Sequence, residues 1–488
     1  MALGERLASI RIGPVRYNSP TTQVFIVGVV CFLSPGLFNA LSGLGAGGTQ
    51  DVVLVDTGNA ILYAMFAIFG IIGGTINNIL GARLTLCIGT LGYSLYAGSL
   101  WAFQIHGNRA FVIAASAILG MCAGLLWTAQ GAIMMAYPEE KDKGRAFSLF
   151  WSVFTMGGVV GSAIALGIQA NRSLPSTSTA VYLVFVILML IAILVTWLVL
   201  PASYVVRGNG TVVELQDSMG AREEIGNFIA QFKDWRMLAL FPMFFCSNYF
   251  YSYQGSIVSM MFNPRTRALS SFLSNLGAVI GAIIIGNVLD RVPGSRRTRS
   301  IVGWCFTVFF MCLVWGAGFG WQTKFSRHEK LAMDWTNSKA RGPLVLMFAY
   351  YMVDSFYQGL AYYTMSTITN DPFRLARMAG YYKGVQSAGA AVSFGMDAVG
   401  TAYMTEIAVS FAIMMASLPL CLLVLWHTSD SNYESENTIH VESLDEDQLH
   451  HAALPSGHHT GGVHENALGE TTSDEKNSEV HLDTKSAA

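Results

Sequence analysis

Charged residues are scarce in this chain, and their scarcity argues against most classes of soluble protein. Asp, Glu, Lys and Arg make up 12% of the 488 residues, whereas about a quarter of the residues in a soluble domain are charged. Hydrophobic residues make up 52%. A soluble globular enzyme is therefore not expected.

Cysteine and the common catalytic motifs are also sparse. The seven cysteines are scattered through apolar runs, where a free Cys behaves as a small hydrophobic residue. No disulfide framework, Cys/His zinc site, phosphate-cradling glycine loop, Ser-His-Asp arrangement or paired-carboxylate site is apparent. The basic residues are dispersed, which gives no support to nucleic-acid binding. We expect no enzymatic activity, no cofactor and no bound metal.

The chain contains many long apolar stretches of sequence, called windows below. They are about 20 residues long, the length that a helix needs to cross a bilayer. The first 20 residues lack the apolar core of a cleavable signal peptide, so the first window is expected to be retained. The sequence predicts an all-α membrane protein with twelve transmembrane helices, near residues 21–43, 57–79, 84–103, 110–136, 146–168, 180–200, 237–261, 269–289, 300–320, 343–366, 379–400 and 404–426.

The loops differ in their Lys and Arg content, and this difference predicts orientation. With the N-terminus in the cytoplasm, the cytoplasmic segments carry 17 Lys and Arg and the opposite side carries nine. Because positively charged loops tend to stay inside, both termini are predicted to be cytoplasmic. The loop near 321–342 holds five of the nine and argues against this orientation. Plasma membrane and endomembrane are not distinguished.

A polar connection divides the chain into two halves. Within it Ile225, Phe228, Ile229 and Phe232 recur at helical spacing, which predicts an amphipathic helix. This helix is either a strut on the membrane surface that couples the halves or a plain solvated linker. The predicted parts are a cytoplasmic N-terminal segment (1–20), an N-terminal six-helix bundle (21–200), the cytoplasmic linker (201–236), a C-terminal six-helix bundle (237–426) and a tail (427–488).

The tail differs in composition from everything before it. Residues 427–488 hold 13 Asp and Glu against 2 Lys and Arg, and eight of the ten histidines. Such a composition buries too little apolar surface to offset the entropy cost of ordering, so an acidic, His-rich, disordered tail is expected. The pairs His450-His451 and His458-His459 offer metal ligands, but nothing fixes a geometry. A solvated regulatory or trafficking tail is the preferred interpretation.

Two similar stretches stand at the ends of the second and eighth windows, 212 residues apart. Each reads Gly, a short gap, Asn or Asp, and then Gly-x-Arg. In a tight turn the Gly would allow close helix contact, the Asn or Asp would cap or pair, and the Arg would anchor at the headgroups. The alternative is that short cytoplasmic loops often contain Gly and Arg. The matching positions are Gly74, Asn78, Gly81 and Arg83 in the first copy and Gly286, Asp290, Gly294 and Arg296 in the second.

These motifs give the chain a family resemblance. The first copy resembles the loop Gly-x-x-x-Asp-x-x-Gly-x-Arg/Lys of the major facilitator superfamily, with Asn78 in the acidic position. Three further runs resemble its uncoordinated-93-like branch: Gly36-Leu37-Phe38-Asn39-Ala40-Leu41, Leu126-Trp127-Thr128-Ala129-Gln130-Gly131 and Tyr137-Pro138-Glu139-Glu140-Lys141-Asp142-Lys143-Gly144-Arg145. The resemblance implies the major facilitator fold, with two pseudo-symmetric six-helix bundles and a midplane cavity. Members of this branch are described both as transporter-like proteins and as regulators of channels or receptor trafficking.

Asp354 is the clearest candidate for chemistry within the membrane. An ionisable side chain at bilayer depth is costly and usually faces a cavity or a partner. Tyr350, Tyr357 and Gln358 fall at i−4, i+3 and i+4 from it on a helix. The group could bind a cationic or hydroxylated ligand, or titrate during transport. The alternative is a structural carboxylate that is hydrogen-bonded to those tyrosines.

Other polar and aromatic residues extend the candidate site. In the first and seventh helices, which line the cavity in this superfamily, Asn39, Asn248, Tyr251 and Gln254 stand out, and the fourth window adds Trp127 and Gln130. Such residues either bind flat or amphipathic ligands or join helices by hydrogen bonds. Lys383 and Asp397 lie near the predicted ends of the eleventh helix, where a structural role is at least as well supported.

Two functions follow from the sequence. The first is a multi-pass transporter that moves a small organic solute across the lipid bilayer by alternating access, with the substrate unknown. The second is a non-transporting regulator of channels or of membrane-protein trafficking, with a membrane protein as its partner.

Overall fold

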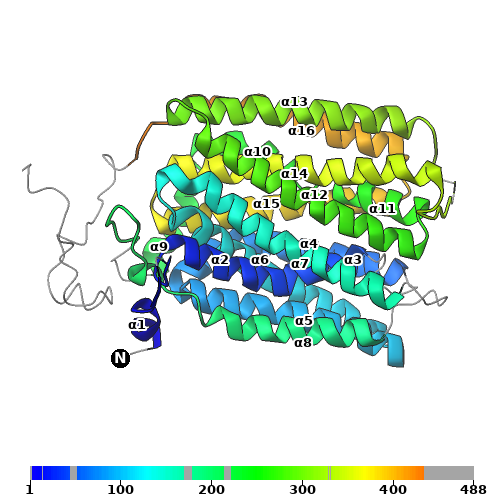
Figure 1. Ribbon diagram of the computed structural model, residues 1–488, viewed down its shortest axis with the longest axis horizontal. Helices are drawn as coiled ribbons and strands as arrows, with labels where there is room; N and C mark the ends of the chain where they lie inside the picture. The colour runs from blue at the N-terminus through cyan, green and yellow to red at the C-terminus, as the bar shows by residue number, and fades with distance from the viewer. Residues whose placement is uncertain are drawn as a thin grey trace, which may run out of the picture.

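The computed structural model describes residues 3–13, 15–43, 52–169, 179–213, 221–327, 329 and 331–432, and almost all of its regular structure is helical. Long helices run side by side and form one elongated bundle (Figure 1). The strands of this described part are the short antiparallel pair β1 (Arg11–Ile12) and β2 (Val15–Arg16). We call the end of the bundle at which α1 and the last described residues lie the terminal end (Figure 1).

The first half of the chain supplies one set of helices. After the short α1 (Leu3–Ala8), a single helical stretch contains a π-helical turn, and five long helices follow it. The elements are α2 (Pro20–Cys31), η1 (Phe32–Gly36), α3 (Leu37–Gly43), α4 (Val52–Leu80), α5 (Ala82–His106), α6 (Arg109–Ala136), η3 (Glu140–Asp142), α7 (Lys143–Gln169) and α8 (Thr179–Thr196).

The second half repeats this pattern after the linker. Its first long segment is again interrupted, here between two short helices. The linker contains η4 (Ala202–Tyr204) and α9 (Ala221–Gln231). The elements of the second half are α10 (Trp235–Cys246), α11 (Tyr251–Met261), α12 (Pro264–Arg291), α13 (Arg296–Gln322), η5 (Ser338–Ala340), α14 (Arg341–Ile368), α15 (Pro372–Ala398) and α16 (Tyr403–Trp426).

Several helices begin at a capping residue that the sequence supplies. The side chains of Ser19, Asn263 and Asp371 each accept a hydrogen bond from a backbone N–H in the first turn, and a proline follows each of them. A side-chain acceptor satisfies one of the free N–H groups at a helix start, and proline at the first position lacks an N–H that would otherwise be unpaired. These caps place the start of α15 at Pro372, seven residues before the predicted window at 379.

Nine helical segments of the described residues are long and apolar enough to cross a membrane, judged by length and composition. They coincide with nine of the twelve predicted windows. The other three windows correspond to α14, to α15 and to the interrupted pair α10 and α11, which lie in the bundle but are not among the nine. The structure therefore supports an all-helical, multi-pass membrane protein, and the count of twelve spans stays a prediction.

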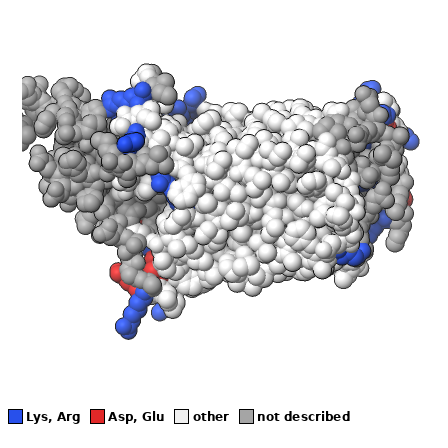
Figure 2. All heavy atoms as spheres, turned by 90° about the horizontal axis from the view of Figure 1, so that it is seen from below, with Lys and Arg blue, Asp and Glu red and all other residues white. Residues whose placement is uncertain are grey.

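The surface agrees with insertion in a membrane. On the face seen in Figure 2, the charged side chains lie toward the two ends of the bundle. Large apolar side chains are exposed on several of the long helices, among them Ile68, Leu194, Phe309 and Val345. In water such a surface would be unfavourable, whereas lipid chains solvate it. The tail from residue 433 onward, with its histidine pairs, lies outside the described residues.

The two halves meet along two long interfaces, one between α4 and α15 and one between α7 and α12. The helices approach closely because small residues face each other. A Cβ added to Gly70 on α4 would lie 2.7 Å from the backbone nitrogen of Gly384 on α15. At the α7–α12 interface the hydroxyls of Ser162 and Ser271 lie 2.8 Å apart. These two interfaces enclose the space in which the candidate site lies.

Candidate functional site

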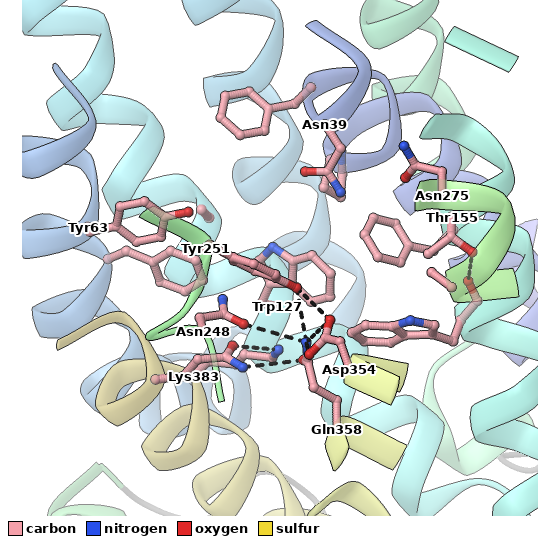
Figure 3. Close-up of a pocket in the computed structure, with 18 of the residues that line it drawn as sticks. Asn39, Tyr63, Trp127, Thr155, Asn248, Tyr251, Asn275, Asp354, Gln358 and Lys383 are labelled. Carbon is pink, nitrogen blue, oxygen red and sulfur yellow. Dashed lines mark hydrogen bonds between the residues drawn. The ribbon is translucent and has the colours of Figure 1, made fainter. Parts of the chain in front are cut away.

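A cavity lies between the two halves, and both halves contribute to its wall (Figure 3). Its volume is about 110 Å³. For comparison, a cavity of about 150 Å³ holds one benzene molecule. The cavity therefore has room for a small organic molecule no larger than about benzene, with about six non-hydrogen atoms, in this conformation. Apolar and aromatic residues form most of the wall, and a few polar groups converge on it.

The interrupted helices bring two polar segments to the cavity. In the first half, Pro35 lies in the π-helical turn η1, and Asn39 follows it on α3. In the second half, α10 ends at Cys246, and Asn248 and Tyr251 lie in and just after the break. All three polar residues line the cavity. Breaks at matching places in the two halves thus expose polar side chains where a continuous helix would pack against its neighbours.

Asp354 lies in the wall of the cavity and is 4% exposed. Its carboxylate accepts a hydrogen bond from the hydroxyl of Tyr251, at 2.7 Å, and one from the amide of Gln358, at 3.0 Å. Figure 3 shows these three side chains pointing toward one another. Hydrogen bonds to the ionised form stabilise a buried carboxylate, which would otherwise be costly. The acid is therefore held in place by neighbours from α11 and α14.

Lys383 is the second charged residue of the cavity wall, and sequence reasoning missed it as a site residue. It is 3% exposed and lies twelve positions into α15, well inside the helix rather than near its end. Its ammonium lies 4.6 Å from the ring centre of Trp127 and 4.8 Å from that of Tyr382. A cation over an aromatic face is attracted by the ring's negative face. The cap Asp371-Pro372 was the sequence signal that could have placed Lys383 inside the helix.

Two glutamines connect the base to the acid. The ammonium of Lys383 donates to Gln386 at 2.8 Å, and the amide of Gln386 donates to the side-chain oxygen of Gln358 at 3.3 Å. Gln358 in turn donates to Asp354. Each amide in this chain accepts at its oxygen and donates at its nitrogen, so the network is mutually consistent. The four side chains form one polar wall on the second half of the protein.

The structure brings six of the ten sequence-selected residues to the cavity and places four elsewhere. Tyr357 shares hydrogen bonds with Ser417 and Cys246, and Tyr350 packs on Trp315. The six that line the cavity are Asp354, Gln358, Asn39, Trp127, Asn248 and Tyr251, and the four that do not are Tyr350, Tyr357, Gln130 and Gln254. A role in substrate binding stays a prediction for all ten.

Helix geometry explains the division around Asp354. At 3.6 residues per turn, Gln358 lies about 40° to one side of Asp354, while Tyr350 and Tyr357 lie about 40° and 60° to the other. The cavity faces the side of α14 on which Gln358 lies, so Gln358 and Tyr351, about 60° from the acid on that side, share it with Asp354, and Tyr350 and Tyr357 do not. Gln130 is displaced for a different reason, because it lies beside Tyr362, whose hydroxyl donates to its side-chain oxygen at 3.4 Å.

The second glycine-rich copy forms a contact between the halves. The carboxylate of Asp290, near the end of α12, accepts hydrogen bonds from the backbone N–H groups of Gly144 and Arg145 at the start of α7. Free N–H groups at a helix start favour an anion. Arg296, after the turn, donates to the carbonyl of Ser366. Gly294 adopts a positive φ of 123°, which glycine tolerates.

The first copy makes the corresponding contact with a different set of atoms. The amide of Asn78, near the end of α4, donates to the carbonyl of Phe373 at the start of α15 and to the carboxylate of Glu224 on α9. Glu224 also pairs with Arg377 at 2.8 Å, and both are buried. The linker helix thus supplies the carboxylate that Asn78 lacks.

The other residues of the first copy lie close to the neighbouring segments. Gly74 packs on the backbone of Arg377, and Gly81 adopts a positive φ of 78°. Arg83 donates a hydrogen bond to the carbonyl of Val199.

The linker is held at the terminal end by a second ion pair. Asp234 caps α10 and bonds to the guanidinium groups of Arg236 and Arg374. Burial opposes ionisation of this carboxyl, but its hydrogen bonds from Arg236 and Arg374 outweigh that effect and hold the pKa of Asp234 below its ordinary value. The carboxylate therefore stays charged at physiological pH and ties α10 to α15.

Comparison with known proteins agrees with this architecture. Residues 56–418 match the family model described as "Ion channel regulatory protein UNC-93". The chain belongs to the UNC-93 family. UNC93-like protein C922.05c of Schizosaccharomyces pombe is 36% identical to this UNC-93 chain over 423 residues, which cover 85% of the chain and 84% of that protein. UNC93-like protein 1 of Arabidopsis thaliana is 36% identical over 429 residues, covering 86% and 94%.

Solved structures show which fold the UNC-93 chain shares. A variant of the Escherichia coli fucose:proton symporter FucP aligns with a TM-score of 0.57 at 13% identity, covering 84% of this chain and 99% of that one. FucP in the outward conformation, described as a major facilitator superfamily transporter, aligns with a TM-score of 0.56 at the same identity, covering 83% and 99%. At this identity the likeness establishes the fold alone. This member of the UNC-93 family therefore has the major facilitator fold, as its sequence motifs predicted.

Proposed function

We propose that this protein is a transporter that moves a small organic solute across the bilayer by alternating access. The observation that carries the proposal is the cavity between the halves, where a buried acid, a buried base and several aromatic rings converge. A buried charge is costly, and ionisable residues inside a membrane commonly mark a substrate or ion pathway. In the major facilitator fold, substrate sites lie between the two halves near the bilayer midplane.

The interfaces around the cavity fit a rocking movement. Contacts between α7 and α12 stand at the terminal end, where Asp290 meets the start of α7, and farther along, where Ser162 meets Ser271. These contacts use hydrogen bonds and small residues rather than large interlocked side chains. Such an interface can open at one end while it closes at the other, which is what alternating access requires.

The terminal end would then face the cytoplasm, as the distribution of Lys and Arg predicts. In this orientation α9 lies at the cytoplasmic surface, where its exposed Ile225 and Ile229 can enter the headgroup region while Glu224 faces the protein. We therefore favour the interpretation of the linker helix as a strut that couples the two halves.

Uptake into liposomes tests the proposal. The purified protein would be screened with labelled organic solutes, with and without a pH gradient, alongside Asp354→Asn and the control Glu223→Gln. Glu223 is exposed on α9 and does not line the cavity, so its variant should transport normally. The proposal predicts that Asp354→Asn reaches the membrane in normal amounts yet loses flux. Equal flux in both variants would contradict it.

The family description supports a second function, regulation of an ion channel. In that case the protein would act through contact with a membrane-protein partner, and no solute would cross. Normal cellular function of Asp354→Asn, together with loss of function on deletion of residues 427–488, would favour regulation over transport.

A further inference from the structure

Lys383 has unused hydrogen-bonding capacity inside the cavity. An ammonium carries three N–H donors. Among the described residues, the one hydrogen bond from this ammonium goes to Gln386, and no carboxylate forms an ion pair with it. Aromatic rings from both halves surround it, those of Trp127 and Trp151 from the first half and those of Tyr362 and Tyr382 from the second.

The acid of the cavity differs from the base in this respect. Asp354 already accepts hydrogen bonds at both carboxylate oxygens, one from Tyr251 and two from the amide of Gln358. Both oxygens of Asp354 thus accept hydrogen bonds from the protein, whereas two N–H groups of Lys383 form no hydrogen bond with the described residues and are left for a ligand. Trp151, also on the cavity wall, has an indole N–H with no hydrogen-bond partner among the described residues. Both of these unfilled groups, on Lys383 and Trp151, are donors, and donors select an anion.

The rest of the wall limits what that anion can be. Phe38, Leu62, Phe66 and Leu119 line the cavity and offer apolar surface for a hydrocarbon body. A bare inorganic anion would leave this surface unused. The volume of about 110 Å³ excludes large ligands in this conformation. A short aliphatic carboxylate fits both the unfilled donors and the apolar wall.

We infer that Lys383 is the anchor for the carboxylate of a small organic anion, which binds with its apolar body against the aromatic wall of the cavity. This inference rests on the proposed function for its site and adds the class of substrate. Because rings of both halves surround the ammonium, a carboxylate bound there would touch both halves at once. The ligand would in this way stabilise the closed arrangement of the two bundles.

Three probes of nearly equal size and different charge test the inference. Butyrate is an anion, butyramide is its neutral analogue and butylamine is a cation at neutral pH. Calorimetric titration of the purified, full-length protein in detergent should show saturable binding of butyrate, weaker by about tenfold to a hundredfold for butyramide, which lacks a charge-assisted hydrogen bond. Butylamine should not bind measurably. Equal affinity for butyrate and butyramide, preference for butylamine, or no saturable butyrate binding would each overturn the inference.

Variants at the same position give a second, independent test. Lys383→Met keeps most of the length of the side chain and removes its charge, so butyrate affinity should fall by about the same factor while butyramide affinity changes little. Lys324→Met is the matched control, because Lys324 is exposed and lies outside the cavity wall. The comparison of the three probes on the unchanged protein decides the matter if Lys383→Met does not fold.

The inference and the proposed function fail in different ways. Selective butyrate binding with no uptake in liposomes would support the anion site and contradict transport. Uptake of a neutral or cationic solute, with no preference for butyrate over butyramide, would support transport and overturn the anion site.

Discussion

Changing Glu224 to Gln should lower the free energy of unfolding by about 3 kcal/mol, because it leaves Arg377 buried without a counter-charge. Glu224 is fully buried and Arg377 is 7% exposed, and their nitrogen and oxygen atoms lie 2.8 Å apart. Breaking a buried pair by removing one partner costs about 3 to 5 kcal/mol in other proteins. We expect the lower end, since Gln keeps the shape of the side chain and can still accept from Asn78.

A double-mutant cycle isolates the pair from other effects. Glu224→Gln, Arg377→Gln and the double variant would be unfolded by titration with SDS in mixed micelles. Each single variant leaves one buried charge unpaired, and the double variant leaves none, so the two losses should not add. We expect a coupling energy of at least about 2 kcal/mol. Glu223→Gln, at the exposed neighbouring position, should change stability by less than about 0.5 kcal/mol. A coupling energy below about 0.5 kcal/mol would refute the view that this pair fastens the linker to the second half.

Two other substitutions probe the contact between the halves. Gly74→Ala should destabilise the protein by about 1 to 3 kcal/mol, since the new methyl group would meet the backbone of α15. Gly98→Ala, on the open side of α5, should be neutral or stabilising, and an equal loss at both positions in thermal unfolding would argue against tight packing at Gly74. Lys143→Met should cost about 2 kcal/mol, because the buried ammonium bonds to Asn370 and to a backbone carbonyl. Lys141→Met, where the side chain is exposed, should leave the melting temperature unchanged.

The fold follows from local signals in the sequence. Apolar windows of membrane-spanning length predicted where helices lie, and the two glycine-rich copies predicted an internal repeat, which the contacts of Asn78 and Asp290 at the helix starts reflect. The apolar spacing of Ile225 and Ile229 predicted the helix of the linker, which the structure places at Ala221–Gln231. These signals act over a few neighbouring residues, so one sequence is enough to recognise them.

The candidate site was harder to predict because its contacts are distant in the sequence. Tyr251 and Asp354 are 103 residues apart, and no pattern near either residue shows that they form a hydrogen bond. Lys383 was placed near a helix end because hydropathy fixes a window less sharply than the cap at Asp371 fixes a helix start. The two sides of α14 around Asp354 are similar in composition, so its sequence alone does not show that Tyr357 turns away from the cavity.

Movement of the two halves is the central claim of the proposed function, and a reversible cross-link tests it most directly. The hydroxyls of Ser162 and Ser271 lie 2.8 Å apart across the interface of α7 and α12, so Ser162→Cys and Ser271→Cys should form a disulfide with little rearrangement. Residues Cys87, Cys305 and Cys312, which are not buried, would first be replaced by Ser. Oxidation should stop uptake into liposomes, and reduction should restore it, because rocking must separate this pair in each cycle. Undiminished uptake with the cross-link fully formed would contradict alternating access.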